Sequence, residues 1–325
     1  KVQREISPLQ GLQARLAKDG VEVDFARGYV GDVTGAYNGV TTGQNLEDKR
    51  SEAELIAEAV EKAKAADCVI LFGGLNKSDY QDCEGHDRQQ YELPYAQDKL
   101  ITALAAANKN FVYVNISGNA VAMPWRDKVP AIVQGWYLGS EAGEALAAVL
   151  TGDANPSGKL PFTWVKSLQN VGAHALNTYP GTWRKEGGSK TEGNIIDEEY
   201  KEGIYVGYRW ADLKKQRPVF AFGHGLSYTQ FAISNLRADK ASMTAADSIT
   251  FTVQVKNIGQ RAGSETVQLY VHDAKASVDR PLKELKGFSK VSLQPGESKD
   301  VSITLGKDAL SFYDETTTSW KAEPG

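Results

Sequence analysis

The segment Asp79–Arg88 concentrates the side chains of this sequence that are best suited to proton transfer. Within ten residues it holds four carboxylates, a histidine and an arginine, which are Asp79, Asp82, Glu84, Asp87, His86 and Arg88. One interpretation is a solvated acidic loop with a surface ion pair, Asp87–Arg88 or Glu84–Arg88. The alternative is a loop that presents a carboxylic acid to a sugar. Glycosidic hydrolysis uses two carboxyl groups, one as general acid/base and one as nucleophile or base. A Glu can serve as acid/base where a closed site raises its pKa.

The element that must position this loop is the almost wholly apolar run Asp67–Phe72, which ends at Gly73 and Gly74. Such a run is typical of a strand buried on both faces of a parallel sheet. Cys68 within it is therefore expected to be a buried small hydrophobe. Ligands of open parallel sheets bind beyond the carboxyl ends of the strands, and the Asp79–Arg88 loop follows that end.

Strand and helix patterns alternate up to about residue 165, which predicts an open, mostly parallel α/β sheet as a first domain over residues 1–165. The expected strands are Val21–Phe25, Asp67–Phe72, Phe111–Ile116, Ala131–Trp136 and Leu160–Trp164. The expected helices are Glu52–Ala65, one that begins at Pro94 with Leu100, Ile101, Leu104 and Ala105 on one face, and Glu141–Leu150.

The pattern changes twice after this domain. Residues 166–228 are rich in Gly, Tyr, Trp and charge, and we interpret them as an ordered linker. From about residue 229 apolar residues alternate with period two in Ile249–Val255, Thr266–Val271 and Val301–Leu305. Strands at this spacing predict a small all-β sandwich of the immunoglobulin or fibronectin III type over residues 229–325, expected to lack its last strand.

Composition excludes several classes of protein. The 325 residues are 41% hydrophobic and 24% charged, with 37 basic and 41 acidic side chains and a formal charge of −4. This balance argues against a nucleic-acid binder, and no apolar run approaches the ~20 residues of a membrane span. The four histidines lack metal-ligand spacing and no G-x-G-x-x-G is present, so we predict no metal and no cofactor.

Other features of the sequence leave questions open. A disulfide between Cys68 and Cys83, the two cysteines of the chain, is one possibility. The chain starts at Lys1 without an initiator Met or an apolar leader, and we expect a mature product or part of a longer protein.

Several motifs, in order, resemble the C-terminal portion of glycoside hydrolase family 3, the β-glucosidase and β-xylosidase family. They are Ser7–Leu12, Ala66–Leu75, Glu84–Arg88 (E-G-x-D-R) followed by Leu93-Pro94, Asn155–Pro161 (N-P-S-G-K-L-P), Tyr205–Arg209 (Y-V-G-Y-R) and Phe222–Thr229 (F-G-x-G-L-S-Y-T). The resemblance covers nearly the whole chain. It implies an α/β sandwich and a fibronectin III-like domain, and it suggests a periplasmic or secreted location.

The resemblance implies that Glu84 is the general acid/base. Asp82, His86, Asp87 and Arg88 are then expected to support the loop or to contact substrate, with Asp82 and Glu92 as rival acids. Two neighbours depart from the family pattern: Cys83 stands where Gly, Ser or Thr is common, and His86 where an aromatic residue or Asn is common.

The family's nucleophile is an Asp on a separate (β/α)8 barrel, which also carries most sugar-binding residues, and neither is recognisable here. The motif around Asp127 is no match. The resemblance therefore implies part of a retaining, exo-acting β-glycosidase that acts on β-linked gluco- or xylo-oligosaccharides, inactive without a barrel in another chain or in a missing part of the same polypeptide. A nucleophile must lie about 5 Å from the acid/base. The alternative is a non-catalytic carbohydrate-binding or scaffolding module that has lost the barrel.

Overall fold

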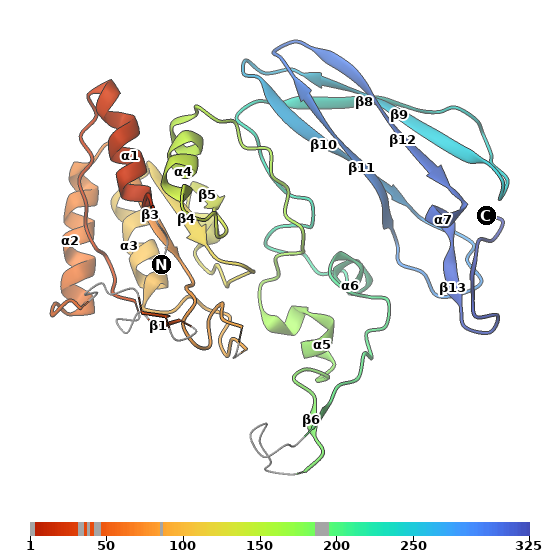
Figure 1. Ribbon diagram of the computed structural model, residues 1–325, viewed down its shortest axis with the longest axis horizontal. Helices are drawn as coiled ribbons and strands as arrows, with labels where there is room; N and C mark the ends of the chain where they lie inside the picture. The colour runs from red at the N-terminus through yellow and green to blue at the C-terminus, as the bar shows by residue number, and fades with distance from the viewer. Residues whose placement is uncertain (1–3, 32–35, 38–39, 42–46, 85–86, 186–194) are drawn as a thin grey trace. The chain divides into compact units, whose positions relative to one another are not determined.

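The computed structural model describes residues 4–31, 36–37, 40–41, 47–84, 87–185 and 195–325, and these form two compact units (Figure 1). The N-terminal unit comprises Lys1–Asp153 with Val165–Ser167, and the C-terminal unit comprises Ala154–Trp164 with Leu168–Gly325. The domain boundaries expected at residues 165 and 228 stay predictions.

The N-terminal unit contains a three-stranded parallel sheet. Its order is β3-β4-β5, with β3 over Val69–Gly74, β4 over Phe111–Ile116 and β5 over Ala131–Gln134. The predicted parallel α/β fold is confirmed. The central strand β4 carries the buried core, because Phe111, Tyr113 and Val114 are at most 1% exposed.

The strand β3 is less buried than its apolar sequence predicts. Val69 to Phe72 are only partly buried, and the chain is fully buried only at Gly73 and Gly74. The prediction of a strand covered on both faces is therefore wrong for the described sheet, because β3 is its edge strand with β4 as its one partner. Cys68 is exposed, not buried as predicted, because it precedes the first residue of β3.

Two expected strands do not belong to this sheet. Val21–Phe25 forms no strand; instead, the Lys62 ammonium group donates to Asp24 Oδ1 (2.8 Å) and to the Phe25 carbonyl (2.7 Å) and ties this segment to a helix. Leu160–Trp164 lies in the C-terminal unit, where Trp164 forms an isolated antiparallel bridge with Phe220.

The described part of the N-terminal unit has four α-helices, namely α1 (Pro8–Leu16), α2 (Glu52–Ala65), α3 (Gln97–Ala107) and α4 (Ala142–Thr151). Helix α2 begins at a capping box, in which the Ser51 hydroxyl accepts from the Glu54 amide and the Glu54 carboxylate accepts from the Ser51 amide. Helix α3 begins at Gln97 and not at Pro94, since Tyr95 and Ala96 have positive φ. Its predicted apolar face is correct. Helix α4 ends at Gly152, whose φ of 82° suits a glycine C-cap.

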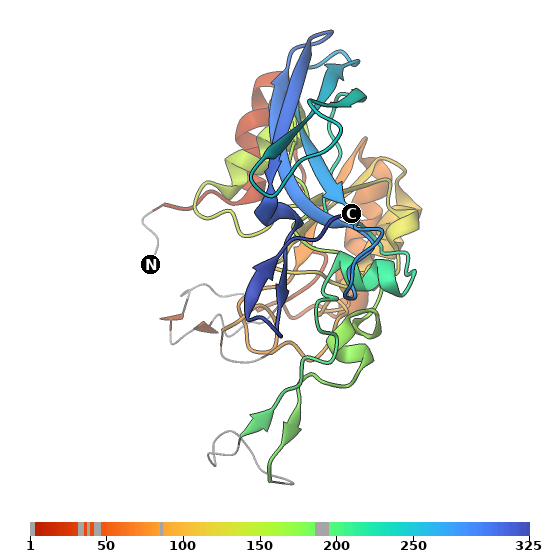
Figure 2. The same cartoon turned by 90° about the vertical axis from the view of Figure 1, so that its right-hand side faces the viewer.

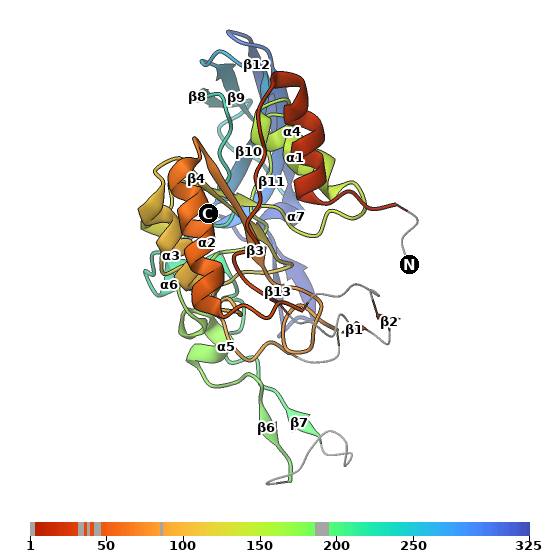
Figure 3. The same ribbon diagram turned by 90° about the vertical axis from the view of Figure 1, so that its left-hand side faces the viewer.

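The helices pack in pairs. Helix α2 packs against α3, and α1 packs against α4. Figure 3 shows β3 running between the two pairs. The α1–α4 contact depends on glycine, because a Cβ at Gly11 would stand 2.1 Å from the Gly143 carbonyl oxygen.

The C-terminal unit contains the predicted β-sandwich, confirmed as a three-stranded sheet β12-β9-β8 and a two-stranded sheet β10-β11, both antiparallel (Figure 2). Their bounds are β8 (Phe231–Ala238), β9 (Ser248–Asn257), β10 (Gly263–Val271), β11 (Glu284–Leu293) and β12 (Ser298–Gly306). Its core consists of Val255, Val267, Leu293 and Val301. A turn at Gln294–Glu297 joins β11 to β12, with Gly296 at φ 77°.

The remaining elements are short. They are η1 (Ala17–Asp19), β1 (Ala36–Tyr37), β2 (Val40–Thr41), η2 (Arg126–Lys128), η3 (Leu168–Asn170), α5 (Gly172–Ala175), β6 (Thr182–Trp183), β7 (Ile196–Asp197), α6 (Tyr208–Leu213), α7 (Lys307–Leu310), β13 (Phe312–Asp314) and β14 (Ser319–Lys321).

The Asn155–Pro161 motif joins parts of the C-terminal unit. The Asn155 amide donates to the Ala262 carbonyl (2.8 Å), and its oxygen accepts from the Ser227 hydroxyl (2.9 Å) and the Tyr228 amide (2.8 Å). Lys159 donates to the Gly225 carbonyl at 2.7 Å. The motif thus serves packing within this unit.

We expect Asn155→Ala to lower the free energy of unfolding by about 1–3 kcal/mol, because three hydrogen-bonding groups lose their partner at once. Urea denaturation measures the change. Ser157→Ala is the matched control: among the described residues its hydroxyl accepts one hydrogen bond, from the exposed side chain of Lys290, so its effect should stay within about 0.5 kcal/mol. Equal effects of the two substitutions would contradict the prediction.

Candidate active-site loop

The loop that carries Glu84 begins at two glycines that close the end of β3. Gly74 has φ 130°, and a Cβ there would stand 2.0 Å from the Ile116 carbonyl oxygen. The buried Gln97 side chain binds the Gly74 backbone on both sides: its Oε1 accepts from the Gly74 amide (2.7 Å) and its Nε2 donates to the Gly74 carbonyl (2.8 Å). The direction of the chain as it leaves the sheet is therefore fixed by α3.

The first part of the loop folds back on itself. The Asn76 side-chain oxygen accepts from the Ser78 amide (2.8 Å), and the Asn76 carbonyl accepts from the Asp82 amide (3.0 Å). The Gln81 side chain accepts from the Asn76 amide at 3.1 Å, and Tyr80 has φ 63°. These contacts return the chain to the sheet edge at Asp82.

The Asp82 carboxylate joins three loops at the carboxyl edge of the sheet. It accepts from the Gly118 amide (2.6 Å) and the Asn119 side-chain amide (2.8 Å), both after β4, and from the Tyr137 hydroxyl (2.8 Å), after β5. Burial, and then the bond to Asp82, raise the pKa of Tyr137 well above its ordinary value, so its hydroxyl stays a proton donor. Since both carboxylate oxygens are engaged, Asp82 has the geometry of a brace and not of a proton donor to substrate.

Arg88 holds the other end of the segment to the same loop after β4. Its guanidinium donates to the Asn119 side-chain oxygen (2.9 Å) and to the Ala120 carbonyl (2.7 Å), and it lies 5.4 Å from the centre of the Tyr91 ring. Burial lowers the pKa of Arg88, although an arginine stays protonated in either case. These contacts tie Arg88 to the loop after β4, and its expected role in loop support or substrate contact stays a prediction.

Glu84 lies between these two braces and is exposed. Among the residues that the structure describes, no hydrogen bond or ion pair holds its carboxylate. Asp87 is also exposed, and the rival acid Glu92 is exposed beyond the loop. His86 falls outside the described residues. The structure thus brings Asp82 and Arg88 together at Asn119. Glu84 lies between them in the sequence, and its carboxylate is unengaged among the described residues.

A network of hydrogen bonds between polar side chains joins the carboxyl ends of β4 and β5 to the loop that follows β4. The Asn115 amide donates to the Ser117 hydroxyl and to Gln134 Oε1, both at 2.7 Å, and the Tyr113 hydroxyl donates to Asn115 Oδ1 at 3.0 Å. The Ser117 hydroxyl in turn donates to the Asn119 carbonyl at 2.7 Å.

Sequence reasoning missed these residues, and above all it missed Gly118, Asn119 and Tyr137. The available signal was a polar run directly after the Phe111–Ile116 strand, because loops after neighbouring parallel strands meet at one edge.

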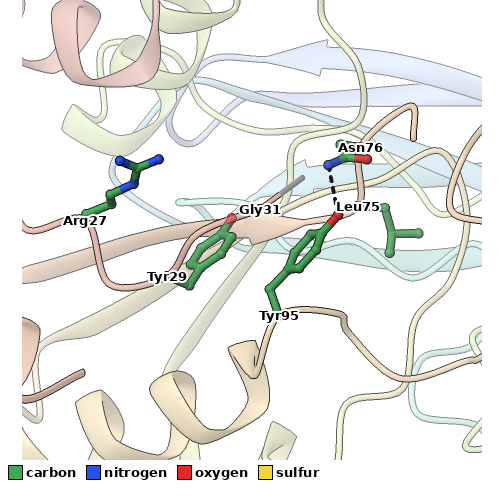
Figure 4. A pocket seen from close by; sticks show the side chains of 7 residues that line it. Arg27, Tyr29, Gly31, Leu75, Asn76 and Tyr95 are labelled. Carbon is green, nitrogen blue, oxygen red and sulfur yellow. Dashed lines mark hydrogen bonds between the residues drawn. The ribbon is translucent and has the colours of Figure 1, made fainter. Parts of the chain in front are cut away.

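A pocket of about 200 Å³ lies next to the start of the loop (Figure 4). Its lining comprises Arg27, Tyr29, Gly31, Gly74, Leu75, Asn76 and Tyr95. The Tyr29 and Tyr95 rings are stacked with centres 6.4 Å apart, and the Asn76 amide donates to the Tyr95 hydroxyl at 3.4 Å. The volume is below the ~300–1,000 Å³ of common ligand pockets. Glu84 does not line it, so the pocket adds nothing to the acid's position.

The described part of the chain contains no candidate metal cluster, no disulfide and no helix that could span a membrane. No group of three or more His, Cys, Asp or Glu there could hold a metal ion. Cys68 and Cys83, both described, do not form a disulfide with each other. None of the helices that the structure describes has the length and hydropathy to cross a membrane.

Comparison with known families gives two matches. Residues 1–208 match the family model described as glycosyl hydrolase family 3 C-terminal domain, and residues 265–325 match the fibronectin type III-like domain.

Relatives match over only part of their length. The chain is 47% identical over 333 residues to beta-glucosidase BoGH3A of Bacteroides ovatus, covering 100% of this chain and 41% of that protein. It is 44% identical to thermostable beta-glucosidase B of Acetivibrio thermocellus, covering 87% of this chain and 35% of that protein. The chain therefore spans about two fifths or less of these curated relatives.

Solved structures of similar proteins also match this chain over only part of their own length. A GH3 beta-glucosidase of Bifidobacterium adolescentis superposes with a TM-score of 0.81 at 35% identity, over 99% of this chain and 42% of that one. The beta-glucosidase of Kluyveromyces marxianus, in complex with glucose, gives 0.74 at 39% identity, over 86% of this chain and 31% of that one.

Proposed function

Because the chain belongs to the glycosyl hydrolase family 3 C-terminal domain family, we propose that it supplies the general acid/base of a retaining, exo-acting β-glucosidase, and that Glu84 is this residue. The observation that carries the proposal is local. Glu84 is exposed and unengaged among the described residues, while Asp82 and Arg88 on either side of it are held to the sheet edge. A proton donor needs a loop that is fixed in place on either side of it and a carboxyl group that is not engaged by other residues.

The proposed chemistry has two steps. Glu84, protonated, gives its proton to the glycosidic oxygen while a carboxylate nucleophile from the barrel attacks the anomeric carbon, so the leaving sugar departs as a neutral alcohol. The Glu84 carboxylate then takes a proton from water, whose oxygen attacks the anomeric carbon and releases the nucleophile. The proton returned to Glu84 restores the starting state.

The proposed substrate is the non-reducing end of a β-linked gluco-oligosaccharide. The relatives with the highest identity reported above are named beta-glucosidases, and the Kluyveromyces structure contains glucose. A xylo-oligosaccharide is the second candidate. We propose that the (β/α)8 barrel, with the nucleophile and most sugar contacts, lies in the part of the whole protein that this chain does not span.

The test compares this chain alone, the barrel alone and the two joined. With nitrophenyl β-glucoside and cellobiose, we expect no turnover by the chain alone, because one of the two carboxyl groups is absent. The joined protein should hydrolyse both substrates. The barrel alone should be slower on cellobiose by about 10²–10⁴-fold, which is the usual contribution of a positioned acid/base.

The outcome that contradicts the proposal is a barrel that hydrolyses cellobiose equally well without this chain. The chain would then be a non-catalytic module, and direct binding of cello-oligosaccharides to it would support a carbohydrate-binding role.

A further inference from the structure

We propose that Asn119 is the positioning residue that sets the place of Glu84, by joining both ends of its loop segment through one side-chain amide. This inference rests on the proposed function of Glu84. The Asn119 Nδ2 group donates to Asp82 Oδ1 at 2.8 Å, and the Asn119 Oδ1 atom accepts from Arg88 at 2.9 Å. A primary amide offers a donor and an acceptor on one planar group, which is what a bridge between a carboxylate and a guanidinium requires.

The two partners lie on either side of the proposed acid. Asp82 is two residues before Glu84, and Arg88 is four residues after it. Each partner has a second contact with the same loop after β4, since Asp82 accepts from the Gly118 amide and Arg88 donates to the Ala120 carbonyl. Three successive residues therefore contact the two ends of the segment. Gly118 binds Asp82, Ala120 binds Arg88, and Asn119 between them binds both.

The backbone of Asn119 is held by a buried hydrogen-bond network. Its carbonyl accepts from the Ser117 hydroxyl at 2.7 Å, and Ser117 is completely buried. Ser117 is bound in turn by Asn115 of β4, which also binds Gln134 of β5. The position of Asn119 is thus set by the sheet itself, and the Asn119 side chain transmits that position to the loop.

The contact at Asn119 is exposed, so its contribution to folding is small. Its contribution to catalysis depends on geometry, because a shift of about 1 Å in a reacting group can slow a reaction by about 10²-fold. Loss of the bridge should therefore affect proton delivery far more than stability. This contrast separates a positioning residue from a merely structural one.

The experiment uses the chain joined to its barrel and the variants Asn119→Ala and Asn119→Asp. Alanine removes both bonds. Aspartate keeps an acceptor for Arg88 but sets a second carboxylate against Asp82, which is repulsive.

For both variants we expect kcat on cellobiose to fall by about 10–100-fold with KM nearly unchanged. On 2,4-dinitrophenyl β-glucoside, whose leaving group needs no proton, we expect less than about a 3-fold loss in kcat/KM. Thermal unfolding midpoints should stay close to that of the parent protein.

Asn110→Ala is the matched control. Its exposed side-chain amide donates to the Asp67 carbonyl (2.9 Å) before β3, at the opposite edge of the sheet from the loop. Its kinetics should match those of the parent protein on both substrates.

Glu84→Gln is measured in parallel, so that the two proposals can fail separately. If Glu84→Gln slows cellobiose hydrolysis but Asn119→Ala does not, the role of Asn119 is overturned alone. Equal losses on both substrates would also overturn it, because they would show a general defect. An unchanged rate for Glu84→Gln would overturn the proposed function itself.

Discussion

In the enzyme that contains the barrel, Glu84→Gln is expected to lower kcat/KM for cellobiose by about 10²–10⁴-fold. The amide has nearly the shape of the acid but cannot release a proton, so the departing sugar must leave as an alkoxide. In aryl glucosides with acidic leaving groups, the leaving group departs without that proton. The rate of the first step, formation of the glucosyl-enzyme, should therefore fall much less for these substrates. The ratio of the two losses measures proton donation itself.

The same variant gives a second signature in the second step. Without a carboxylate at residue 84, water has no general base, and the glucosyl-enzyme should accumulate with the aryl substrate. Azide needs no base, so it should restore turnover and give the β-glucosyl azide expected for a retaining mechanism.

Glu92→Gln is the control, because Glu92 is a rival acid of the same residue type and is exposed just beyond the loop. This substitution should leave kcat/KM unchanged for both cellobiose and the aryl glucoside. A parent-like rate of Glu84→Gln on cellobiose, or a comparable loss in Glu92→Gln, would remove Glu84 from the role of acid/base.

Gly74→Ala is expected to have the largest effect on stability, a loss of about 3–5 kcal/mol in the free energy of unfolding. Two terms add. Gly74 has φ 130°, a conformation that side chains strongly disfavour, and a Cβ would stand 2.0 Å from the Ile116 carbonyl oxygen. That oxygen already accepts a hydrogen bond from the Leu75 amide at 2.8 Å. To make room for the Cβ, the ends of β3 and β4 would have to move apart, and this hydrogen bond would be lost.

Chemical denaturation measures this loss, and Gly20→Ala is its control. Gly20 also has positive φ, at 68°, but an added Cβ would meet nothing within 4 Å. It should therefore show the backbone strain alone, about 1–2 kcal/mol. If Gly74→Ala destabilised the protein no more than Gly20→Ala, the steric argument at the end of β3 would be wrong.

Local patterns were sufficient for most of the elements, and they failed where pairing decided the outcome. The α2 helix follows from its own capping box and apolar spacing, and β9 and β12 follow from alternation with period two. Val21–Phe25 has an equally strand-like sequence, but a strand needs a ladder partner, which the segment itself cannot specify. The predicted burial of Cys68 failed because the strand begins one residue later, at Val69, and the apolar run alone did not place that boundary.

The candidate site divides in the same way. The sequence by itself determined the parallel α/β sheet, the β-sandwich, and the acidic segment at the end of β3 from which Glu84 was chosen by motif resemblance. Only the tertiary structure decided which of its carboxylates are engaged: Asp82 is bound on both oxygens, and Glu84 is not bound among the described residues. The physical reason is that the partners of Asp82 and Arg88, at residues 118–120 and 137, are more than thirty residues away along the chain and meet the loop only because parallel strands end at one edge.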